Sequence, residues 1–229
     1  MEVNSGKKAR RDACECKETF LSNEKFREVV PLNYIQEVYL NAIQNNTIIF
    51  GVGSAGTGKT YIAAYYAASE LFHKRVERII LSRPNIETGR SLGFLPGSLE
   101  EKYAPYLDPF DSVFHKALGK GFYEYALKSK TIEPRPLGFM RGATFENAIV
   151  LVDECQQMTK AEFHMLLSRI GRNTKIILSG DQGQSDICDS GLLDAVDRLE
   201  GLDDIEVVHF LDSDIVRSKM CKQIIMAYR

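Results

Sequence analysis

The sequence predicts an α/β fold with a mostly parallel sheet of about five strands and helices on both faces. Five short apolar runs rich in β-branched residues do not alternate with polar residues, which indicates strands buried on both faces. Helix-like stretches separate most of the runs, as in a parallel sheet covered by crossover helices. The runs are TIIFGVG (47–53), RIILS (78–82), AIVLVD (148–153), KIILSGD (175–181) and IEVVHF (205–210).

The chain divides into an arm and one compact domain. Residues 1–30 mix charges without a sustained hydrophobic period, which predicts an N-terminal arm that is flexible or partly helical. The domain is expected to span residues 31–229. Its first helix is predicted from Leu32 to about Asn45, because one helical face carries Ile35, Val38, Tyr39, Ala42 and Ile43.

The long segment between the second and third strands is predicted to be an insertion over the sheet and not a second domain. A chain of 229 residues is short for two full-size domains. Within the insertion, TIEPRPLGFMRG (131–142) offers one further short strand.

The composition limits the classes of function. Lys and Arg number 29 against 31 Asp and Glu, so the chain lacks a general positive field and any nucleic-acid contact must come from local patches. Five cysteines without a C-x-x-C pair indicate free thiols in a reducing compartment. No window is apolar enough for a membrane helix, so we expect a cytoplasmic protein without membrane contact.

A phosphate-binding loop is predicted between the first strand and the helix-forming run YIAAYYAASELF. The segment matches G-x-x-x-x-G-K-[ST], whose backbone N–H groups and helix N-terminus bind phosphates. The lysine reaches the β- and γ-phosphates, and the final hydroxyl ligates Mg²⁺. The residues are Gly53, Ser54, Ala55, Gly56, Thr57, Gly58, Lys59 and Thr60.

Two further groups of polar residues follow apolar strands. Asp153 can hold the magnesium ion and Glu154 can take a proton from an attacking water, although Asp153 could instead cap the following helix. In the turn after the next strand, a glutamine can sense the γ-phosphate or orient water, although an ordinary turn built on Gly and Asp remains open. The carboxyl ends of parallel strands bring both groups beside the phosphate loop.

Several phrases in the right order resemble the PhoH family, a branch of the superfamily 1 helicase-like ATPases. They are LNYIQEVYLNAI, FGVGSAGTGKTYIA, SRPNIETGRSLGFLPGSLEEK, LGFMRGATFENAIVLVDECQQMT, SGDQGQSD and DIVRSKMCKQIIMAYR. The resemblance covers nearly everything from Leu32 to Arg229 and implies a RecA-like P-loop core. One departure is Cys155, where the family usually has alanine, and we expect it to crowd the site slightly.

The resemblance also implies roles for single residues. Gln36 resembles the glutamine that reads adenine, and Lys59 with Thr60 resembles the Walker A pair. Asp153 and Glu154 resemble the Walker B pair, and Gln184 resembles the γ-phosphate sensor. Arg217, at the start of the predicted last helix, resembles the arginine of the terminal motif, with Arg141 as the rival candidate. The segment Arg83, Pro84, Asn85, Glu87, Gly89 and Arg90 resembles a motif that contacts single-stranded nucleic acid.

The leading hypothesis is a Mg²⁺-dependent ATPase coupled to single-stranded RNA or DNA, with RNA favoured. Superfamily 1 motors close ATP between two RecA-like domains, whereas this chain resembles only the first. A head-to-tail homo-oligomer, such as a hexameric ring, would complete the site. Two other classes remain open: a P-loop small-molecule kinase, and a module that binds ATP to switch assembly without hydrolysing it.

Overall fold

The computed structural model describes residues 26–84, 107–187 and 189–227. The predicted arm therefore lies outside the described residues except for residues 26–30, as do Asn85, Glu87, Gly89 and Arg90 of the proposed nucleic-acid motif. No helix in the described part of the chain is long and apolar enough to cross a membrane.

The described residues form one six-stranded sheet in the order β3-β2-β4-β5-β1-β6, and every neighbouring pair of strands is parallel. All five predicted strands are present, and the insertion supplies the sixth, β3, at the edge beside β2. The strands are β1 (Ile48–Gly53), β2 (Arg78–Ser82), β3 (Ile132–Pro134), β4 (Ala148–Val152), β5 (Thr174–Gly180) and β6 (Ile205–Phe210).

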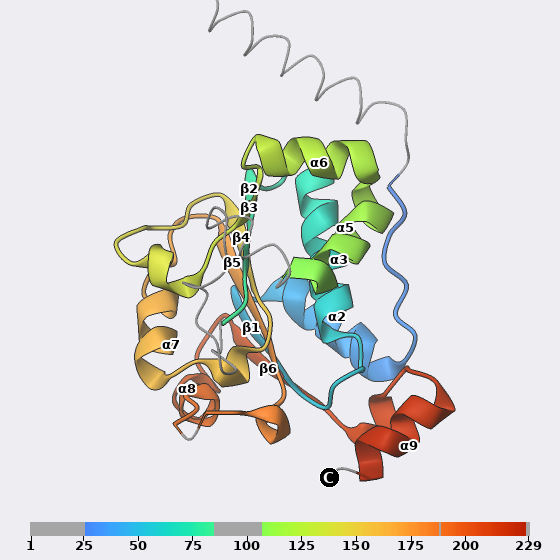
Figure 1. Cartoon of the computed structure of the whole chain (residues 1–229). Helices are drawn as coiled ribbons and strands as arrows, with labels where there is room; N and C mark the ends of the chain where they lie inside the picture. Colours follow the sequence, from blue (N-terminus) through green and yellow to red (C-terminus); the bar gives the residue numbers. More distant parts are fainter. Residues whose placement is uncertain (1–25, 85–106, 188, 228–229) are drawn as a thin grey trace, which may run out of the picture.

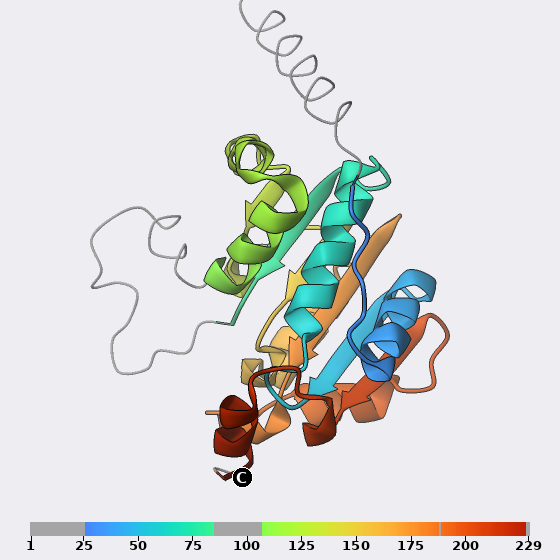
Figure 2. The same cartoon turned by 90° about the vertical axis from the view of Figure 1, so that its right-hand side faces the viewer.

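Helices cover both faces of the sheet, as predicted (Figures 1 and 2). One face carries α2 (Tyr34–Asn45), α3 (Lys59–Phe72), α5 (Asp108–Leu118) and α6 (Lys120–Lys128), and the other carries α7 (Lys160–Leu167) and α8 (Leu192–Leu199). A last helix, α9 (Lys219–Ala227), ends the described part of the chain. Short 3-10 turns complete the domain: η3 (Leu137–Met140), η4 (Cys155–Gln157), η5 (Gln182–Gln184) and η6 (Asp212–Asp214).

The strands β1, β2, β4 and β5 are largely apolar because each contributes to two cores. In β4, Ile149 and Leu151 belong to the core under α2, α3 and α5, whereas Val150 and Val152 belong to the core under α7 and α8. Successive side chains of a strand point to opposite faces, so both faces require apolar residues. This explains why the runs do not alternate in the sequence.

The first helix begins where its capping residue predicts. Asn33 is the N-cap of α2, and its side-chain oxygen accepts a hydrogen bond from the Gln36 N–H. Tyr39, Ala42 and Ile43 on the predicted apolar face are buried against the sheet. The helix thereby brings Gln36 close to the loop that follows β1.

The carboxyl ends of β1, β4 and β5 meet at one edge of the sheet, because these strands are parallel and adjacent. The loop before α3, the Asp153–Glu154 pair and the turn after β5 all start at this edge. This is the position at which open α/β sheets bind ligands.

Candidate nucleotide-binding site

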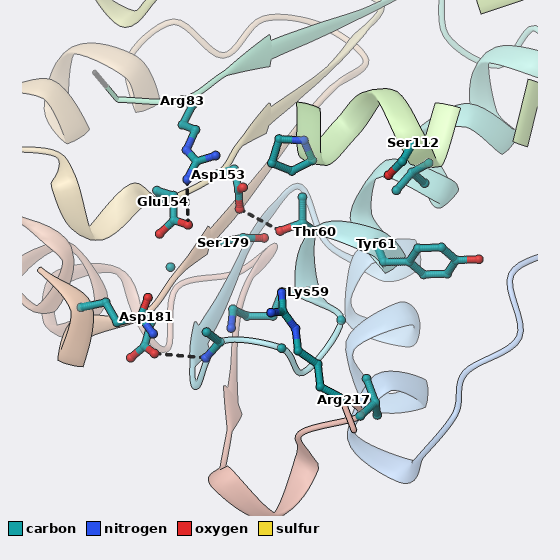
Figure 3. A pocket seen from close by; sticks show the side chains of 18 residues that line it. Lys59, Thr60, Tyr61, Arg83, Ser112, Asp153, Glu154, Ser179, Asp181 and Arg217 are labelled. Carbon is teal, nitrogen blue, oxygen red and sulfur yellow. Dashed lines mark hydrogen bonds and ion pairs between the residues drawn. The ribbon is translucent and has the colours of Figure 1, made fainter. Parts of the chain in front are cut away.

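The loop between β1 and α3 has the backbone of a phosphate-binding loop. Gly53 has a φ of 128°, and a Cβ at this position would lie 2.0 Å from the Phe210 carbonyl oxygen of β6, so only glycine fits. Lys59 begins α3, whose N-terminal N–H groups and positive end of the dipole favour an anion. The loop borders a cavity of about 540 Å³ (Figure 3), a size usual for a small-molecule site.

The Lys59 side chain is folded back onto its own loop. Its Nζ donates to the carbonyl oxygens of Gly53 and Ser54, each at 2.7 Å. Burial lowers the pKa of this ammonium group, while the nearby carboxylates of Asp181, Asp153 and Glu154 act in the opposite direction. The oxygens of a bound phosphate would give the Lys59 ammonium negatively charged acceptors in place of these two neutral carbonyls.

Thr60 and Asp153 provide two adjacent oxygen atoms for a cation. The Thr60 hydroxyl donates to Asp153 Oδ1 at 2.8 Å, and both residues line the cavity. Burial raises the pKa of Asp153, and the neighbouring Glu154 carboxylate adds to this effect. A hydroxyl and a carboxylate fit Mg²⁺, which proteins usually hold through one or two ligands together with phosphates and waters. The described residues contain no cluster of three His, Cys, Asp or Glu side chains suited to a metal.

Glu154 projects its carboxylate into the same cavity. Its backbone is left-handed, with a φ of 55°, and it is the N-cap of η4, so Asp153 does not cap this turn. Oε1 pairs with Arg83 Nη2 at 3.1 Å, and Oε2 accepts from Gln156 Nε2 at 2.6 Å. Sequence reasoning connected Arg83 with nucleic acid, but the structure directs its side chain to the acid pair (Figure 3).

The turn after β5 contacts the phosphate loop directly. Asp181 Oδ2 accepts from the Ala55 N–H at 3.1 Å, and Oδ1 accepts from the Gly183 N–H at 3.1 Å. Gln184, at the end of η5, also lines the cavity. The turn therefore has specific contacts with the site.

Of the two candidate arginines, the structure brings Arg217 to the cavity. Its Cδ lies 2.9 Å from where a Cβ on Gly56 would stand, and the Val216 N–H donates to the Gly56 carbonyl at 3.0 Å. The expectation that Arg217 starts the last helix is wrong, since α9 begins at Lys219. Arg141 is exposed, follows η3 on the α7 side of the sheet and does not line the cavity.

Gln36 holds the phosphate loop and does not face the cavity. Its Nε2 donates to the Thr57 carbonyl at 2.8 Å, and its Oε1 accepts from the Leu32 N–H at 2.8 Å. Only 2% of the residue is exposed. The adenine contact that the resemblance implies stays a prediction.

Cys155 does not crowd the cavity, contrary to expectation. Its side chain is fully buried in the core under α7 and α8, and burial raises the pKa of the thiol. The sequence pattern also missed the cavity wall formed by Pro109, Ser112 and Val113 of α5. These residues belong to the insertion and carry no motif.

Fold and site together define a P-loop protein. The PhoH-like protein family model matches residues 28–229, so the chain belongs to the PhoH family. It is 43% identical over 206 residues to Protein PhoH of Escherichia coli, covering 87% of this chain and 58% of that protein. It is 40% identical over 214 residues to a PhoH-like protein of Bacillus subtilis, covering 92% of this chain and 67% of that protein.

A solved structure shows the same fold. The large terminase of a thermophilic bacteriophage superposes with a TM-score of 0.52, covering 85% of this chain and 50% of that chain, at 16% identity. The likeness identifies a RecA-like α/β fold and, at this identity, the fold alone. The chain spans 58% of the length of the Escherichia coli relative.

Proposed function

We propose that this protein hydrolyses ATP in a Mg²⁺-dependent reaction at the cavity before α3. One observation carries the proposal: the phosphate loop, the Thr60–Asp153 oxygen pair and the Glu154 carboxylate all line a single cavity. These are the groups that phosphate binding, cation binding and activation of a water require.

Each group has a separate part in the reaction. The loop amides and Lys59 bind the β- and γ-phosphates, and Thr60 with Asp153 holds Mg²⁺, which neutralises phosphate charge when bound. Glu154 accepts a proton from the attacking water. Gln184 and Arg217, which both line the cavity, contact the γ-phosphate as its charge changes. Gln36 keeps the loop in place, and a contact with the adenine edge would require its amide to leave the Thr57 carbonyl or the Leu32 N–H.

We further propose that hydrolysis is coupled to single-stranded nucleic acid in a head-to-tail homo-oligomer in the cytoplasm, such as a hexameric ring. Arg217 lines the cavity of its own subunit, which supports a role in the same chain. Arg141 is exposed and away from that cavity, so it is the better candidate to reach a neighbour's nucleotide. Light scattering with ATP and Mg²⁺ tests the assembly, and a fully active monomer would contradict it.

The central experiment measures phosphate release with and without single-stranded RNA or DNA. The variants are Lys59→Ala and Glu154→Gln, and the exposed residues of α6 provide matched controls, Lys128→Ala and Glu124→Gln. We expect Lys59→Ala to lose hydrolysis and Glu154→Gln to bind ATP while hydrolysing it about 10²- to 10⁴-fold more slowly. Activity that survives Lys59→Ala would refute the assignment.

The same assay separates the other two classes of function. A small-molecule kinase would transfer the phosphoryl group to an added acceptor and release little inorganic phosphate. An assembly switch would bind ATP without releasing phosphate at saturation. Stimulation by one type of strand would support the nucleic-acid coupling and identify its ligand.

A further inference from the structure

Two adjacent buried glutamines lie in η4, between the carboxyl ends of β4 and β5. Gln156 is 1% exposed and Gln157 is 9% exposed, and both side chains make hydrogen bonds to the loop that follows β5. We propose that they are positioning residues: Gln156 orients Glu154, and Gln157 orients the turn that carries Gln184. This inference rests on the proposed ATPase function.

Gln156 joins Glu154, the proposed proton acceptor, to the backbone at the end of the neighbouring strand. Its Oε1 accepts from the Asp181 N–H at 3.0 Å, and its Nε2 donates to Glu154 Oε2 at 2.6 Å. Because a backbone N–H can only donate, the amide oxygen must face Asp181 and the NH₂ group must face Glu154. The orientation of the amide is thus fixed by its surroundings, and Glu154 receives a directed donor.

The close approach of η4 to β5 depends on Gly180. A Cβ on Gly180 would lie 2.7 Å from Cys155 Sγ, 2.9 Å from Gln156 Oε1 and 3.1 Å from Gln156 N. The missing side chain therefore leaves room for the turn that carries both glutamines. Glu154 precedes this turn in a left-handed conformation, which a residue with a side chain adopts at some cost in free energy.

Gln157 holds the turn that carries Gln184 through hydrogen bonds of the same kind. Its Oε1 accepts from the Asp186 N–H at 3.0 Å, so its NH₂ group faces the other way. That group donates to the Gln184 carbonyl and to Asp186 Oδ2, each at 2.9 Å. These contacts fix the backbone of Gln184 relative to η4.

One turn thereby sets the distance between the proton acceptor and the γ-phosphate sensor. Nucleotide binding needs neither contact, because the phosphate loop and Lys59 are held by other groups. Misplacement of a catalytic group by about 1 Å can cost on the order of 10²-fold in rate. We therefore expect Gln156→Leu and Gln157→Leu each to lower kcat by about this factor, with KM for ATP little changed.

A double-mutant cycle tests whether each glutamine acts through its stated partner. Single-turnover hydrolysis is measured for both leucine variants, alone and combined with Glu154→Gln or Gln184→Ala. Gln156→Leu should cause no further loss in the Glu154→Gln background, whereas Gln157→Leu should still slow that background. In the Gln184→Ala background, Gln157→Leu should cause no further loss, whereas Gln156→Leu should still slow hydrolysis.

An isosteric variant covers the possibility that leucine disturbs folding. Gln156→Glu keeps an acceptor for the Asp181 N–H but puts a second buried carboxyl group beside Glu154, so kcat should fall, and Kd for ATP, which does not depend on this contact, reports whether the variant is folded. The inference would be overturned if kcat were unchanged in Gln156→Glu and Gln156→Leu. It would also be overturned if Gln156→Leu slowed hydrolysis by the same factor in the parent and in the Glu154→Gln background. Absence of hydrolysis in the parent would instead defeat the proposed function, so the two failures are distinguishable.

Discussion

The Asp181 carboxylate accepts a hydrogen bond from the Ala55 N–H, a backbone donor that a bound phosphate would also need. This carboxylate is nearly buried and is the strongest of the charges that favour the protonated form of Lys59. The carboxylate thus stands in for an anion at the loop. We predict that Asp181→Ala tightens the binding of ADP in the absence of Mg²⁺.

The expected change in Kd follows from the hydrogen bond between the Ala55 N–H and Asp181, which must break when phosphate binds to the parent protein. A hydrogen bond to a charged group contributes about 1.5–3 kcal/mol, and each 1.4 kcal/mol corresponds to about tenfold in Kd. Water takes over the freed Ala55 N–H in the variant, which favours the lower end of the range. We expect Kd to fall about tenfold for Asp181→Ala. Asp181→Asn, which keeps a neutral acceptor, should give a smaller decrease.

Calorimetric titration with Mg²⁺-free ADP at constant ionic strength measures this directly. Asp189→Ala removes an exposed carboxylate from the same loop and controls for the change in net charge. It should leave Kd nearly unchanged. Weaker or equal binding by Asp181→Ala would refute the reasoning, because it would mean that the carboxylate does not compete with phosphate.

Three further predictions follow from single contacts. Gly180→Ala should lower kcat about tenfold or more, because its Cβ would displace Gln156. Gly138→Ala should leave kcat unchanged, because a Cβ there meets nothing within 4 Å. Steady-state kinetics compares the two variants. Thr60→Ala should raise the Mg²⁺ concentration for half-maximal hydrolysis about tenfold or more, and an EDTA-treated parent should be inactive until Mg²⁺ is restored. Thr159→Ala should lower the free energy of unfolding by about 1 kcal/mol in urea without changing ADP affinity, because Thr159 and Glu162 form the capping box of α7.

The strands and the phosphate loop could be predicted because their signals are local. An unalternating apolar run identifies a strand of a covered parallel sheet, and the glycines with Lys59 and Thr60 occupy fixed spacings. The edge strand β3 was foreseen only as an option, since its three residues carry little pattern. Its pairing with β2 needs the tertiary structure.

The contacts of Arg83, Gln156 and Gln157 could not be predicted because they depend on distant partners. Gln156 binds the N–H of Asp181, 25 positions away, and this contact requires the space beside Gly180. The pairing of Arg83 with Glu154 spans 71 positions. A polar residue after a strand shows that the site is near, but its partner is set by the order of the strands in the sheet.

Asp181 uses different atoms to contact the phosphate loop and Gln156, which makes nucleotide binding and positioning separable. Its carboxylate contacts Ala55 and Gly183, whereas its backbone N–H holds Gln156. A phosphate that displaces the carboxylate therefore leaves the Gln156–Glu154 contact intact. We predict that Asp181→Asn lowers Kd for ADP but changes kcat only a few-fold. Gln156→Leu should instead lower kcat strongly and leave Kd for ADP nearly unchanged. Titration and single-turnover hydrolysis of both variants provide the check, and a large parallel change of Kd and kcat in either variant would contradict the separation.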